Sequence, residues 1–277
     1  MLKSILIGLD GSPFSPAVIE LGIGLARQFG ALLAGLAVVD EPAICGPESV
    51  PLGATAFKKH RDELRLAEAR KTVAETLRDF GVRCGDAGVS SRSIEAVGVP
   101  SEQILLEAQR CDLVLLGQRT YFHFETQDEP DDTLHSVVKN SPRPVIAVPE
   151  KPHRATSVVV AYDGSLQAAR TLQAFQCLGM GRSGAVHLVC VHDDQEEAAR
   201  RAERAVEYLR LHEIAAHPQV VATSAPPARV ILEKARAFDA GLLVMGAYGQ
   251  PTLREFFFGS VTRTVLHECN VPVFLYH

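Results

Sequence analysis

The sequence predicts an α/β protein made of two tandem doubly wound domains, each with a five-stranded parallel sheet and helices on both faces. The nine residues 4–12, which end in Asp-Gly-Ser, return as a similar run at 157–165. Short apolar runs alternate along the chain with longer amphipathic stretches, as in strands followed by helices. These runs are continuously apolar, which is typical of parallel strands buried on both faces.

Two further matches show that the repeat extends through both halves. Residues 112–117 resemble 241–246, and residues 143–148 resemble 271–276. Three matches in the same order indicate a duplicated domain.

The seam between the copies lies at 149–156, where two prolines and three basic residues interrupt the apolar pattern. We therefore expect one domain at 1–150 and a second at 156–277. A chain of 277 residues is long enough for both to have their own core.

The elements of the second copy follow one another in strict alternation. The apolar runs predict strands at 157–162, 185–191, about 218–223, 241–246 and 271–276. The stretches between them predict helices at 166–179, 194–212, 226–238 and 259–269. Strand twist makes the crossovers right-handed. Glu and Arg residues four apart near residue 200 are expected to form a solvated helix face.

The first copy has the same plan with one insertion. Its second strand is followed by the Pro- and Gly-rich segment 41–53, which the second copy lacks. Such a segment is a surface loop that could cover a site or a partner, although we favour a tolerated insertion.

Composition excludes several classes of protein. Residues 1–150 carry 15 Lys and Arg against 21 Asp and Glu, and residues 151–277 carry 13 against 12, so neither half is a nucleic-acid surface. No apolar stretch approaches the roughly 20 residues that span a membrane. The start of the chain runs into Asp10 without a signal-peptide cleavage site.

The six scattered cysteines are expected to be free thiols, as in a reducing compartment, and we expect a cytoplasmic protein.

The second copy places glycines and polar residues where the strands end. Ligands of doubly wound sheets bind beyond the carboxyl ends of the strands. Asp163 follows the first strand, and Gly246-x2-Gly249-x9-Gly259-Ser260 follows the fourth. These glycines could take positive φ and let backbone N–H groups approach a phosphate, and Gly259-Ser260 opens a helix whose N-terminus favours an anion.

The spacing therefore predicts a split phosphate cradle. Asp163 could bind ribose hydroxyls or a Mg²⁺ ion on the phosphates, Val191 could flank a base, and Arg254 could add positive charge. The alternative reading keeps the glycines as turn formers and helix caps, and Asp163 as the N-cap of the next helix.

The Asp-Gly-Ser turn, the run 244–249 (Val-Met-Gly-Ala-Tyr-Gly) and the segment 259–273 together resemble the universal stress protein family (UspA-like) in tandem form. The resemblance covers nearly the whole chain. It implies Rossmann-like five-stranded domains that pair through their last strands, and ATP or a related nucleotide bound with Mg²⁺ or Mn²⁺. By matching positions it places around the nucleotide Ala161, Asp163, Val191, Gly246, Gly249, Gln250, Gly259, Ser260, Val261 and Thr262.

The first copy departs from this pattern where the phosphates would bind. Thr120 stands in place of the second glycine, and Asp131-Asp132 stand in place of Gly-Ser. Two carboxylates at a helix N-terminus oppose the dipole that attracts phosphate. We therefore expect one nucleotide per chain, in the second domain. A metal site in the acidic segment is not favoured, because no ligand spacing fits its residues His123, Glu125, Asp128, Asp132 and His135.

Three functions compete. We favour a stress-response protein in which ATP occupancy sets the conformation or the assembly state, with no catalytic residue. A slow metal-dependent ATPase or nucleotidyl-transfer enzyme is the second reading, but neither Ser-Gly-Gly-x-Asp-Ser nor His-x-Gly-His is present. The third is a nucleotide-independent scaffold. The apolar last strands near 145–148 and 273–276 would pair with each other or in a homodimer.

Overall fold

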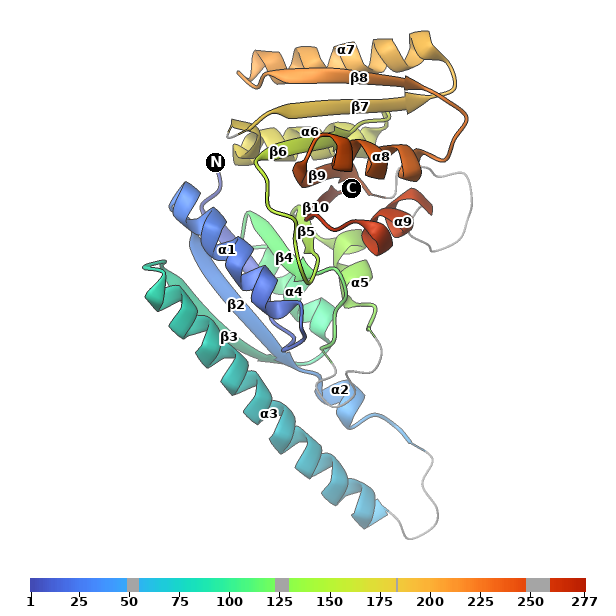
Figure 1. The fold of residues 1–277 in the computed structure, drawn as a ribbon. Helices are drawn as coiled ribbons and strands as arrows, with labels where there is room; N and C mark the ends of the chain where they lie inside the picture. Colours follow the sequence, from blue (N-terminus) through green and yellow to red (C-terminus); the bar gives the residue numbers. More distant parts are fainter. Residues whose placement is uncertain (49–54, 123–129, 183, 248–259) are drawn as a thin grey trace. The chain divides into compact units, whose positions relative to one another are not determined.

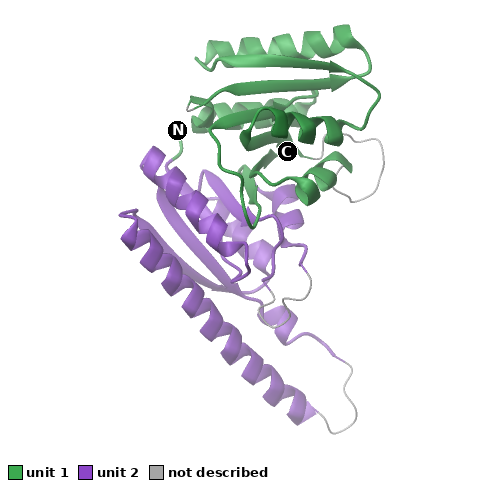
Figure 2. Cartoon of the chain, in the orientation of Figure 1, with its two compact units in different colours: residues 1–2, 143–277 green, residues 3–142 purple. Residues whose placement is uncertain are grey.

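The computed structural model describes residues 1–48, 55–122, 130–182, 184–247 and 260–277 (Figure 1). The chain divides into two compact units (Figure 2). Unit 1 contains residues 1–2 and 143–277, and so the whole second copy with the end of the first, whereas unit 2 contains residues 3–142 of the first copy. Each unit has parallel strands covered by helices, which confirms the α/β fold class.

Unit 2 has four parallel strands in the order β3-β2-β1-β4. They are β1 (Ser4–Gly8), β2 (Leu32–Val39), β3 (Ser91–Val97) and β4 (Leu113–Gly117). Right-handed crossovers put two helices on each face. The helices are α1 (Ser15–Phe29) and α3 (Thr55–Asp86) on one face, α4 (Pro100–Ala108) and α5 (Thr133–Asn140) on the other, and the short α2 (Glu41–Ile44) before α3.

A glycine fixes the distance between α3 and the sheet of unit 2. The ring of Phe80 is fully buried, and a Cβ placed on Gly35 would lie 2.6 Å from it. Any larger residue would push α3 away from β2, so glycine permits this close packing.

Unit 1 has six strands in the order β5-β10-β9-β6-β7-β8, and all neighbours are parallel except β5 and β10. They are β5 (Val145–Val148), β6 (Ser157–Ala161), β7 (Val186–His192), β8 (Ala216–Ala222), β9 (Ala240–Gly246) and β10 (Val273–Tyr276). The helices are α6 (Leu166–Leu178), α7 (Gln195–Leu211), α8 (Pro227–Ala237) and α9 (Ser260–Glu268), with a 3₁₀ turn η1 (Met180–Arg182). All lie close to the limits that the sequence predicted.

Crossover handedness sorts these helices onto two faces. The connections through α6 and α7 run toward β8, and those through α8 and α9 run back toward β10, so the two pairs cover opposite faces. The helices pack accordingly: α7 lies against β7 and β8, and α8 lies beside α9 (Figure 1).

The last strands of the two copies pair, as the sequence suggested. β5 runs antiparallel to β10, with Ile146 opposite Phe274, and both side chains are fully buried. β5 therefore belongs to unit 1 although it closes the first copy, and the unit boundary falls at Pro142. The domain limits 1–150 and 156–277 stay a prediction.

The cysteines are thiols, as expected, and all six lie in the described residues. Four are buried, and burial raises the pKa of Cys190 to about 12. Within the described residues, no helix has both the length and the apolar character needed to cross a bilayer.

Candidate functional site

Predicted site residues from three strands lie at one edge of unit 1. Ala161 ends β6, Val191 lies next to the end of β7, and Gly246 ends β9. Ala161 pairs in register with Val189 of β7 and with Met245 of β9. The carboxyl ends of these strands therefore meet, as the doubly wound fold requires. Four predicted residues lie outside the described part of the chain, namely Gly249, Gln250, Arg254 and Gly259.

Asp163 lies in the turn between β6 and α6. Its Oδ1 accepts a hydrogen bond from the Ser165 N–H at 2.9 Å, and Gly164 between them has φ +78°. Ser165 caps α6, because its Oγ accepts from the Ala168 N–H at 3.1 Å. The alternative that Asp163 is the N-cap is therefore wrong. Asp163 is exposed, and within the described residues its Oδ2 accepts no hydrogen bond.

Gly246 serves a different purpose from the one the sequence suggested. Its φ is not positive. Instead, a Cβ at this position would lie 2.8 Å from the backbone nitrogen of Ala168. Glycine is needed here because the first turn of α6 packs directly on the end of β9. Gly246 thus holds α6 and its preceding turn close to the sheet edge.

The predicted run 260–262 forms the start of α9. Ser260 is exposed, Val261 is half-buried, and Thr262 is only 3% exposed. The side chain of Thr262 therefore belongs to the core. Ser260 is thus the exposed residue at this helix start, where the helix dipole favours an anion.

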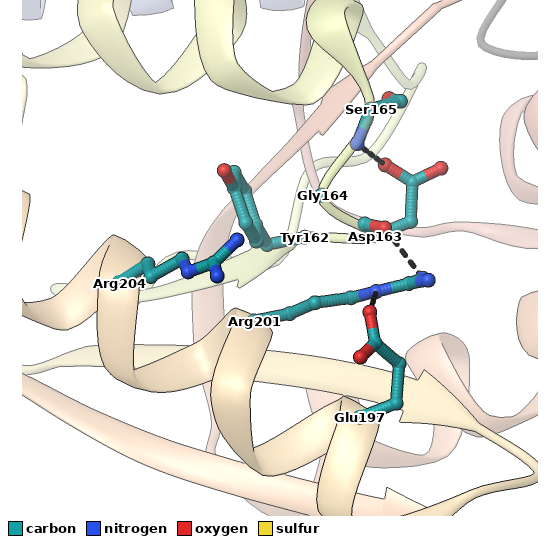
Figure 3. A pocket seen from close by; sticks show the side chains of 7 residues that line it. All are labelled: Tyr162, Asp163, Gly164, Ser165, Glu197, Arg201 and Arg204. Atoms are coloured by element: carbon teal, nitrogen blue, oxygen red, sulfur yellow. Dashed lines mark hydrogen bonds and ion pairs between the residues drawn. The ribbon is translucent and has the colours of Figure 1, made fainter.

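A hollow of about 360 Å³ opens beside Asp163 (Figure 3). Residues 162–165 form one wall, and the other is formed by three side chains of α7, Glu197, Arg201 and Arg204. Arg201 joins the walls, because its Nη1 donates to the backbone oxygen of Asp163 at 2.8 Å. Its Nε donates to Oε1 of Glu197 at 2.7 Å.

The electrostatics of this wall come from short-range pairs. Hydrogen bonds from Arg200 and Arg201 lower the pKa of Glu197 to about 2. The N–H groups of Glu197 and Glu196 lower the pKa of Asp194, which caps α7. Burial is the main cause that raises the pKa of Tyr162, whose phenol therefore stays neutral near pH 7.

Sequence reasoning missed the part that α7 plays. Its charged residues were expected to form a solvated face, but Arg201 is only partly exposed and contacts the Asp163 turn. The sequence does indicate this contact, because the second copy lacks the insertion found at 41–53 of the first. Its helix therefore begins at Gln195, soon after the strand ends at His192. Its first turns consequently lie beside the sheet edge.

The corresponding turn of unit 2 is closed. Asp10 is only 3% exposed. Its Oδ1 accepts from the Ser12 N–H at 3.0 Å and from the Ser15 hydroxyl at 2.8 Å. Its Oδ2 accepts from the Tyr121 N–H at 2.8 Å. Both carboxylate oxygens are therefore engaged by the chain itself.

Asp131 occupies the start of the last helix in unit 2. Its Oδ1 accepts from the Thr133 N–H at 2.9 Å and from the Thr120 hydroxyl at 2.5 Å. Its Oδ2 accepts from the Phe122 N–H at 2.6 Å. Since α5 begins at Thr133, a carboxylate of the protein takes donors that would otherwise face an anion.

The acidic segment of the first copy lies only partly within the described residues. Asp132 and His135 are described, whereas His123, Glu125 and Asp128 lie outside the described residues. Within the described ranges, no group of three or more His, Cys, Asp or Glu residues could hold a metal ion.

Comparisons with known proteins agree with this architecture. The model of the "Universal stress protein family" matches residues 1–149 and again 155–277. A universal stress protein of Synechocystis is 24% identical over 98% of this chain and 99% of its own length. The crystal structure of a universal stress protein from Archaeoglobus fulgidus covers 99% of this chain and 97% of its own, with 21% identity and a TM-score of 0.69.

A shorter universal stress protein from the same archaeon was solved in complex with dAMP. It is 25% identical, covers 44% of this chain and 97% of its own, and has a TM-score of 0.35. The two family matches extend over nearly all residues, in the order of the internal repeat. The chain therefore belongs to the universal stress protein family and carries the family domain twice in tandem.

Proposed function

We propose that the second domain binds one adenine nucleotide per chain, ATP with Mg²⁺ or Mn²⁺. The chain then acts in the stress response as a nucleotide-dependent binding or signalling protein. The observation that carries this proposal is the open carboxylate of Asp163 at the edge where β6, β7 and β9 end. A carboxylate there can accept bonds from ribose hydroxyls or bind a metal ion.

The two ends of the proposed site have complementary chemistry. Ala161 and Val191 supply apolar surface beside Asp163, as an adenosine needs. The exposed start of α9 at Ser260 supplies backbone donors for phosphates. The glycines and Arg254 of the intervening segment would complete the phosphate cradle.

The metal would be shared between the protein and the nucleotide. Magnesium in nucleotide sites commonly takes one or two carboxylates together with phosphate oxygens and water. Asp163 fits that requirement, because its Oδ2 has no donor among the described residues and the side chain is exposed. When bound, the ion would neutralise phosphate charge.

The closed turn of unit 2 supports a stoichiometry of one. A nucleotide there would have to displace Tyr121 from Asp10 and Asp131 from the start of α5. Each exchange would leave a carboxylate without its donors, and for the buried Asp10 this costs about 1–3 kcal/mol or more.

Titration calorimetry of the full chain with ATP and Mg²⁺ tests the proposal. We expect one site per chain. Asp163→Ala should weaken binding about tenfold or more, because it removes a charge-assisted contact. Gly259→Asp, which copies the carboxylate of the first domain, should abolish binding.

Asp132→Ala is the matched control, because it removes an exposed carboxylate from unit 2 and should leave the ATP titration unchanged. A stoichiometry near two, or equal affinity in the Asp163→Ala protein and the wild type, would contradict the proposal.

A further inference from the structure

The two arginines that line the hollow beside the Asp163 turn have different surroundings. Arg201 is held by Glu197 and by the backbone oxygen of Asp163. Its stem also packs on the turn, since a Cβ placed on Gly164 would lie 3.1 Å from Cδ of Arg201. These contacts fix Arg201 as part of the wall.

Arg204 lies one turn further along α7, on the same side of the helix. Within the described residues it forms no ion pair and no hydrogen bond, although it lines the hollow. Figure 3 shows its guanidinium group directed toward Tyr162. A cation that faces a hollow without a carboxylate partner has its full set of N–H donors available.

Tyr162 adds a neutral donor next to this cation. Its hydroxyl forms no hydrogen bond with the described residues, and the positive charges of Arg204 and Arg201 act on it. The carboxylate of Glu197 does not compete for Arg204, because Arg200 and Arg201 already donate to it. The hollow thus has available donors on Arg204 and Tyr162, while Arg201 is engaged in the wall by Glu197 and Asp163.

This donor set fits a phosphoryl group, whose three terminal oxygens can each accept a strong hydrogen bond from a planar guanidinium or a phenol. The space of about 360 Å³ lies in the range of small-molecule pockets and far exceeds one phosphate ion. The hollow therefore has room for an organic group joined to the phosphate.

The hollow is separate from the proposed phosphate cradle. It is lined by the turn before α6 and by α7, which share one face of the sheet, whereas α9 lies on the opposite face. A phosphate held by Arg204 consequently cannot be the one that the start of α9 holds. We propose that this hollow is a second phosphate site, which binds a small organic phosphate on the α7 side of the Asp163 turn.

Fluorine NMR can read this site directly. The chain has five tyrosines, so a 3-fluorotyrosine-labelled protein gives a simple spectrum in which Tyr162→Phe identifies the Tyr162 line. The probes are inorganic phosphate and ribose 5-phosphate, with sodium acetate at matched ionic strength as the anion control. We expect a saturable shift of the Tyr162 line with both phosphates, tighter for ribose 5-phosphate, and none with acetate.

Arg204→Gln should raise the dissociation constant about tenfold or more, and Arg204→Lys should recover part of the loss. Arg210→Gln removes the same charge from an exposed position near the end of α7 and should bind as the wild type does. Unchanged lines from the other tyrosines verify that each variant is folded.

The proposal is overturned if the Tyr162 line responds equally to acetate, or if Arg204→Gln and Arg210→Gln bind alike. Repeating the titration with saturating ATP and Mg²⁺ tests whether this phosphate site is separate from the nucleotide's phosphate cradle. An unchanged midpoint supports a separate site, and competition overturns it. The titration without ATP decides on the phosphate site even if the chain binds no nucleotide.

Discussion

The two Asp-Gly-Ser turns of this chain have the same local sequence and opposite accessibility. In both, the aspartate accepts a bond from the serine N–H across a glycine of positive φ. Ser15 and Tyr121 also donate to Asp10, whereas Asp163 is exposed and its Oδ2 accepts no hydrogen bond from the described residues. The turn therefore sets the backbone geometry in both units, whereas a segment distant in sequence closes the carboxylate of Asp10.

The long helix that follows the second strand also differs between the two copies: it is α3 in unit 2 and α7 in unit 1. In unit 2 the charges near the start of α3 pair within the helix and with the insertion: Lys58 donates to Asp62 at 2.5 Å, and Arg61 pairs with Glu48. The Lys58 hydrogen bond lowers the pKa of Asp62, which is 7% exposed. In unit 1, which lacks the insertion, the arginines of α7 face the hollow instead.

The largest difference is expected between alanine substitutions of the two aspartates. Asp10→Ala leaves three donors unpaired, two of them in buried residues, and should lower the free energy of unfolding by about 3 kcal/mol. Asp163→Ala removes one exposed contact and should cost less than about 0.5 kcal/mol. Urea unfolding followed by circular dichroism measures both. Similar losses of unfolding free energy in the two proteins would show that the contacts of Asp10 stabilise the fold no more than that of Asp163.

A smaller effect is expected from the carboxylate at the start of α5. Asp131→Asn keeps the size of the side chain but weakens three charge-assisted hydrogen bonds, so it should cost about 1–2 kcal/mol. The neighbouring Asp132 makes no capping hydrogen bond through its side chain, so Asp132→Asn should cost less. Thermal unfolding of both proteins ranks them, and the reverse order would show that Asp131 does not hold this turn.

The smallest expected effect is a pH dependence confined to unit 1. Burial, and then the charge of His217, lower the pKa of His187 below 6.5. The folded state therefore prefers neutral His187, and its stabilising contribution is lost as pH falls from 6.5 through the folded pKa. The groups around it are His217, the stacked ring of Phe238, and Lys234 over that ring.

The register places Ala34 at the equivalent position of unit 2. His187→Ala should flatten the decline in stability between pH 7 and pH 5, whatever its effect at neutral pH. Urea midpoints across that range measure the slope, and an unchanged slope would assign the acid sensitivity to other groups.

Most of the fold could be predicted from the sequence because continuous apolar runs and helical periodicity are local. The closure of Asp10 could not, because the Tyr121 N–H that seals it lies 111 residues away. Arg201 was missed for the same reason: its charge was visible, but its contact with the backbone of Asp163 arises from packing. Gly246 was predicted as a site residue, yet its neighbour Ala168 supplies a packing reason for glycine that only the structure reveals.

The antiparallel pairing of β5 with β10 has a consequence for synthesis. β10 is translated after all the other strands and helices of the second copy, so the edge of β5 that it covers stays unpaired until then. At about 5–20 residues per second this delay is roughly 10 s. During that interval the apolar strand 145–148 has an unpaired edge, which is a hazard for pairing with other strands that the finished fold no longer shows.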